Sequence, residues 1–197
     1  YDSELRYGGN LAYPSLQGMD SGNNVIYVGT FSKSLFPGLR LGYMVVPEEL
    51  VKPFSGMRFL IDRQSNEILQ MAVAEFIKTG LYETHLLKMR RIFEARRDYL
   101  IQAVQENFGD WGKFIATGRG MHLTFVFNNS DINDEAVADL CRRQGVELRS
   151  ISSFSIGTPL YKGLIMGFGH FPPAQLLAAV SRIGFVLRDK FAAFGPN

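Results

Sequence analysis

The stretch from Val25 to Pro47 constrains the fold most, because it places two short apolar runs on either side of a loop that cannot be helical. VIYVGT (25–30) and LGYMVVP (41–47) are rich in β-branched and aromatic residues, as strands are. Between them, Pro37 and Gly38 break any helix and force a turn. We therefore expect two strands of a larger sheet, the first of them buried and the second placing Tyr43 in the core.

Segments with apolar residues at three- and four-residue spacing follow, and this periodicity predicts helices. The expected helices start at Pro47 and span 66–79 and 82–107. Beyond residue 107 the pattern predicts a small sheet with helices, which is an α+β arrangement. Its expected strands are 123–128, 146–151 and 164–170. We expect one helix that ends near residue 143 and is capped by Asp131, Asn133 or Asp134, and a second helix over 173–191.

Charge and cysteine content narrow the functional classes. The 197 residues carry a net charge of only +2, without the basic face of a nucleic-acid-binding domain. The single cysteine, Cys141, allows no internal disulfide, which is typical of the reducing cytoplasm, and we expect it to be a small buried apolar residue. No apolar run approaches the ~18 residues of a membrane helix. His85 and His122 lack metal-ligand spacing and are expected to have structural or surface roles.

The loop between the two expected strands carries residues of distinctive chemistry. Lys33 follows Thr30 and Ser32, and Arg40 lies seven positions later. A lysine amine of lowered pKa can attack an aldehyde to form a Schiff base, and arginine can bind a phosphate through two parallel hydrogen bonds. Hydroxyl groups add neutral hydrogen bonds to the same anion. Spacing alone fits any phosphate ligand, and a lone loop lysine is most often a solvated surface charge.

The segment GTFSKSLFPGLRLGYMVVP resembles the lysine segment of class I/II aminotransferases, which bind pyridoxal 5′-phosphate (PLP) and have PLP fold type I. More narrowly, it resembles the aminotransferase-like domain of MocR-subfamily GntR transcriptional regulators. THLLKMRRIFEARRDYL, GRGMHLTF and LIMGFGH match as well, so the resemblance covers essentially the whole chain. It implies that residues 1–90 are the C-terminal part of the PLP-binding large α/β domain and that residues 91–197 are the α+β small domain.

The resemblance also implies roles for individual residues. Lys33 is the lysine that forms the Schiff base with PLP. Arg40 and Thr30 hold the cofactor phosphate, with Ser32 as a further helper. Tyr1 corresponds to the tyrosine that hydrogen-bonds the phenolic oxygen of PLP. The family's aspartate for the pyridine nitrogen lies two residues before this tyrosine, so we expect a longer protein to supply it.

One departure from the family affects the expected activity. Aminotransferases carry an arginine for the substrate carboxylate in the strand before the last helix, whereas Leu164 to Met166 are apolar here. Lys162 and Arg149 are nearby but not in clear register, and His170 lies near the family's substrate end. The departure favours a sensor of an amine, an amino acid or PLP itself over a catalyst.

These residues are compatible with three hypotheses about the function of the chain. In the first, the chain is the effector-sensing domain of a cytoplasmic, homodimeric MocR/GntR-type regulator that binds DNA through an N-terminal winged helix. In the second, it is part of a working PLP-dependent aminotransferase acting on an amino acid. The third reading is that the isolated piece is inert, because half of the cofactor site lies elsewhere.

Overall fold

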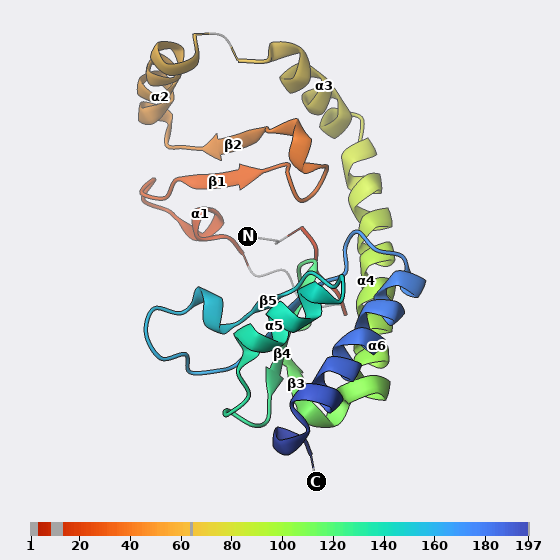
Figure 1. The fold of residues 1–197 in the computed structure, drawn as a ribbon. Helices are drawn as coiled ribbons and strands as arrows, with labels where there is room; N and C mark the ends of the chain where they lie inside the picture. Colours follow the sequence, from red (N-terminus) through yellow and green to blue (C-terminus); the bar gives the residue numbers. More distant parts are fainter. Residues whose placement is uncertain (1–3, 9–13, 64, 197) are drawn as a thin grey trace. The chain divides into compact units, whose positions relative to one another are not determined.

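The computed structural model of the chain describes residues 4–8, 14–63 and 65–196. The chain divides into two compact units, Tyr1–Lys88 and Met89–Asn197 (Figure 1). Helix α4 (Leu81–Phe108) begins in the first unit and continues into the second. The predicted helix over 82–107 is confirmed.

The first unit contains an antiparallel hairpin of β1 (Tyr27–Thr30) and β2 (Gly42–Val45). In the register of this hairpin, Thr30 lies opposite Gly42. The predicted strands are confirmed, but their predicted burial is wrong: Val28 is 69% exposed and Tyr43 is 39% exposed. In the described part of the chain β1 and β2 pair only with each other, so they form a two-stranded hairpin and not the interior of a larger sheet.

Of the three helices that the described residues form wholly within the first unit, the second and third begin within one residue of the predicted start. α1 (Leu16–Met19) is a single turn that the sequence pattern did not predict. α2 (Glu48–Asp62) follows Pro47 and has acidic residues in its first turn, where the helix dipole favours them. α3 (Glu67–Lys78) is capped by Asn66, whose side-chain oxygen accepts a hydrogen bond from the backbone N–H of Leu69 at 3.1 Å.

The second unit is built on a four-stranded antiparallel sheet in the order β3-β4-β6-β5. β3 (Gly112–Ile115) was not predicted, while β4 (His122–Phe127), β5 (Arg149–Ser150) and β6 (Gly163–Gly167) confirm the predicted strands. Phe125 of β4 is buried and meets the Phe108 ring of α4 edge-on, with ring centroids 5.4 Å apart. This contact anchors the end of α4 on the sheet.

Helices α5 (Asp134–Arg143) and α6 (Pro173–Lys190) complete the core of the second unit. Of the three candidate caps of α5, Asn133 is the one used, because its side-chain oxygen accepts from the backbone N–H of Ala136 at 3.0 Å. Cys141 is fully buried, which confirms its prediction as a small apolar residue. In the described residues, no helix is long and apolar enough to cross a membrane.

Candidate functional site

Lys33 lies in a single helical turn directly after β1. The backbone N–H of Leu35 closes this turn by donating to the carbonyl oxygen of Phe31 at 2.8 Å. The N–H of Phe31 in turn donates to the carbonyl oxygen of Leu41 at 3.0 Å, which ties the turn to the start of β2. Lys33 is half-buried. The hairpin therefore holds the lysine on a short, hydrogen-bonded turn rather than on an open loop.

The two hydroxyl residues of the predicted site meet beside this turn. The Thr30 Oγ1 hydroxyl donates to Ser32 Oγ at 3.0 Å, and the backbone N–H of Ser32 donates to Thr30 Oγ1 at 3.2 Å. Thr30 ends β1 and is exposed, whereas Ser32, the residue directly before Lys33, is half-buried. The structure thus brings Thr30 and Ser32 together.

Arg40 ends the 3-10 turn Pro37–Leu39 and has a left-handed backbone, with φ 49° and ψ 37°. A non-glycine residue in this region costs about 1 kcal/mol, and such residues concentrate at functional sites. Arg40 is exposed, and no carboxylate of the described residues lies within ion-pair distance of it. Two hydroxyl groups, an amine and a guanidinium without a carboxylate partner suit a phosphate dianion.

Aromatic rings pack beneath the lysine turn. The Phe31 ring lies 5.2 Å from the Tyr43 ring and 5.9 Å from the Tyr82 ring, measured between centroids. Burial of the hydroxyl group, together with the neighbouring Tyr27, raises the pKa of Tyr43 to about 12. The Tyr43 ring supports the turn by packing against Phe31. Gly29 permits this arrangement, because a Cβ there would collide with the Tyr43 ring.

His85 and Tyr82, which the sequence pattern did not connect with the lysine, reach the same turn from α4. His85 Nε2 donates to the carbonyl oxygen of Ser34 at 3.0 Å. His85 was predicted to have a structural or surface role, and it forms this bond with the residue directly after Lys33. The only signal in the sequence was the three-residue spacing of Tyr82 and His85, which places them on one helix face.

Other predicted features lie outside this arrangement. Tyr1 is outside the described residues, and the role predicted for it stays a prediction. In β6, Leu164 and Met166 are buried apolar residues, and Ile165 lies opposite Arg149 of β5. This register was not visible in the sequence. No group of three or more histidine, cysteine, aspartate or glutamate side chains that could hold a metal ion occurs among the described residues.

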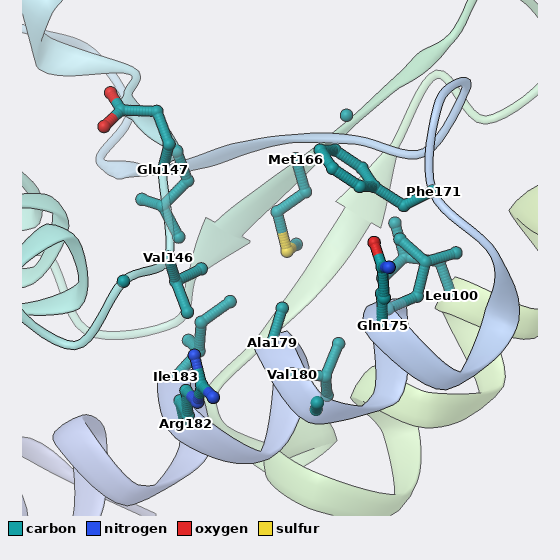
Figure 2. Close-up of a pocket in the computed structure, with 15 residues that line it drawn as sticks. Leu100, Val146, Glu147, Met166, Phe171, Gln175, Ala179, Val180, Arg182 and Ile183 are labelled. Atoms are coloured by element: carbon teal, nitrogen blue, oxygen red, sulfur yellow. The ribbon is translucent and has the colours of Figure 1, made fainter.

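A mainly apolar hollow of about 350 Å³ lies in the second unit between α6, β6 and residues 145–148 (Figure 2). The side chains of Met166 and Ala179 point into it in Figure 2. At the edge of the hollow, Arg182 Nη1 donates a hydrogen bond to the carbonyl oxygen of Gln144 at 3.1 Å. Thr30, Ser32, Lys33 and Arg40 are not among the residues that line this hollow.

Comparison with known proteins decides the family. Residues 3–169 match the family described as aminotransferase class I and II. The chain belongs to this family. Among curated relatives, it is similar to the probable rhizopine catabolism regulatory protein MocR of Rhizobium meliloti, with 33% identity over 98% of this chain and 38% of the relative. It is also similar to the HTH-type transcriptional regulator YhdI of Bacillus subtilis, with 31% identity over 93% of this chain and 39% of the relative.

Solved structures give the same fold. A kynurenine aminotransferase of Pyrococcus horikoshii matches with a TM-score of 0.83 and 23% identity, over 95% of this chain and 46% of that one. The aminotransferase LysN of Thermus thermophilus matches with a TM-score of 0.82 and 22% identity, over 97% of this chain and 49% of that one. The predicted α/β fold type I is confirmed. The chain spans about two-fifths of the length of the regulators that it matches.

Proposed function

We propose that this chain is the PLP-binding, effector-sensing part of a MocR/GntR-type transcriptional regulator. The observation that carries the proposal is the similarity to named regulators: three of them are 30–33% identical over 93–98% of this chain. The aminotransferase-like fold explains how such a regulator would recognise a small amine. The apolar residues Leu164 to Met166, where aminotransferases carry an arginine, agree with sensing without turnover.

In this proposal, residues 1–90 are the C-terminal part of the PLP-binding domain and residues 91–197 are the small domain. When bound, PLP supplies an electrophilic aldehyde that forms a covalent bond with an amine. Lys33 provides the resident amine on its closed turn. Thr30, Ser32 and Arg40 bind the phosphate, and Tyr1 donates to the phenolic oxygen of the cofactor. Every one of these groups is a hydrogen-bond donor, as a phosphate dianion and a phenolate oxygen require.

The proposed ligand of the holoprotein is an amine or amino acid effector that competes with Lys33 for the aldehyde. DNA recognition is assigned to a winged helix that precedes this chain in the whole protein. We further propose that the whole protein is a cytoplasmic homodimer.

The test separates sensing from catalysis in the full-length protein. The PLP-loaded protein is mixed with single L-amino acids or primary amines and a 2-oxo acid acceptor, and its visible spectrum and the oxo acid product are followed. A sensor changes its spectrum and forms no more oxo acid product than there is protein. Repeated turnover would instead establish the alternative, a catalytically active aminotransferase.

A further inference from the structure

The turn that carries Lys33 contacts the start of α4 at two points, which lie three residues apart both on the turn and on the helix. Phe31 and Ser34 lie three residues apart on the turn, and Tyr82 and His85 lie three residues apart on the helix. The Phe31 and Tyr82 rings meet edge-on at an angle of 81°, and His85 Nε2 lies 3.0 Å from the Ser34 carbonyl oxygen. All four residues belong to the first unit, Tyr1–Lys88.

The contact with Ser34 determines which nitrogen of the His85 imidazole must carry a proton. A carbonyl oxygen only accepts hydrogen bonds, so His85 Nε2 must carry the proton. The bond is partly buried, where water competes less for the carbonyl oxygen. Ser34 itself is 3% exposed, so its backbone has little room to move away from the imidazole.

We propose that His85 is a positioning residue for Lys33: by holding the Ser34 carbonyl oxygen, it keeps the lysine turn in the geometry that reacts with an aldehyde. This inference rests on the proposed function, because it concerns the bond between Lys33 and PLP. A turn fixed in advance presents the amine at a high effective concentration, whereas a loose turn must be ordered each time the bond forms.

The proposal predicts that replacement of His85 weakens the binding of PLP but not the binding of pyridoxamine 5′-phosphate. Both affinities can be measured in the full-length protein. Both compounds carry the same phosphate, but only PLP has the aldehyde that bonds to Lys33. His85→Ala should weaken PLP binding by about tenfold, the effect of one good hydrogen bond, and leave pyridoxamine phosphate binding within about twofold. His85→Gln should restore PLP binding, because its amide Nε2–H2 can donate to Ser34 at a similar reach.

Glu83→Ala is the matched control, since Glu83 is an exposed residue on the same turn of α4. It should leave the binding of both compounds unchanged. An equal loss of both compounds in His85→Ala would show a merely structural role and overturn the proposal, as would failure of His85→Gln to restore PLP binding. If wild-type protein binds PLP without any bond to Lys33, the proposed function itself fails, whatever the His85 variants do.

Discussion

In the sheet of the second unit, the absence of a side chain at Gly112 lets the backbones of β3 and β4 approach one another closely. Gly112 begins β3 opposite Phe127, and a Cβ at this position would collide with the backbone carbonyl oxygen of Val126. Because that obstacle is a strand of the sheet and not a flexible side chain, it cannot move aside cheaply. Gly56, within α2, has no atom within 4 Å of the same added group.

These two glycines give opposite predictions for the same substitution. Gly112→Ala should lower the free energy of unfolding by about 3 kcal/mol, through overpacking and strand displacement. Gly56→Ala should raise it by about 0.5–1 kcal/mol, because alanine has the better helix propensity. Urea unfolding of the protein checks both values. Equal effects of the two substitutions would show that the close approach at β3 is not as described.

The buried thiol of Cys141 should make the free energy of unfolding depend on pH in the alkaline range. Burial raises the pKa of its thiol to about 11, from the ordinary value of 9.0 for an exposed cysteine. Between these values the unfolded chain loses a proton that the folded protein keeps, so stability falls as pH rises. We expect Cys141 to account for a loss of about 1–2 kcal/mol between pH 8 and pH 10.5. Urea unfolding at both pH values should show a smaller loss for Cys141→Ala than for wild type, and an equal loss would contradict this assignment.

At the scale of elements, Asp134 connects parts of the second unit that lie far apart in the sequence. It is 1% exposed, and its Oδ2 accepts from the backbone N–H groups of Ser152 and Gly163, each at 3.0 Å. One carboxylate oxygen in the first turn of α5 thus fixes both the chain after β5 and the start of β6. The neighbouring Asn133 only caps its own helix.

Substitution of these neighbours should therefore differ in cost. Asp134→Ala leaves two backbone N–H groups without their acceptor and should cost about 3 kcal/mol. Asn133→Ala removes one helix cap and should cost about 1 kcal/mol. Denaturant unfolding of the two variants measures the difference. If Asp134→Ala were no costlier than Asn133→Ala, the link from α5 to β6 would not contribute to stability.

These elements also show the limits of prediction from the sequence. The helices other than α1 were predicted because apolar residues repeat along them. β3 was missed, since Gly112–Ile115 is too short to show alternation. The bonds of Asp134 join residues 18 and 29 positions away, and His85 reaches Ser34 across 51 positions. Periodicity and local propensity hold no information on such distant pairs.

For the whole molecule, the lysine loop was the most informative part of the sequence. It predicted the family and the grouping of Thr30 and Ser32 near Lys33, because all lie within one short loop. Burial in the first unit was predicted wrongly, because the apolar pattern of β1 and β2 is typical of strands inside a sheet, whereas in the described residues they pair only with each other.

The most direct test of the central claim identifies the residue that binds PLP. The full-length protein is loaded with PLP, reduced with borohydride to make the lysine bond permanent, digested with trypsin and analysed by mass spectrometry. We predict a phosphopyridoxyl group on Lys33, in the uncleaved peptide that ends at Arg40, and its loss in Lys33→Ala. A stable adduct on any other lysine, or visible PLP absorption that survives Lys33→Ala, would contradict this account.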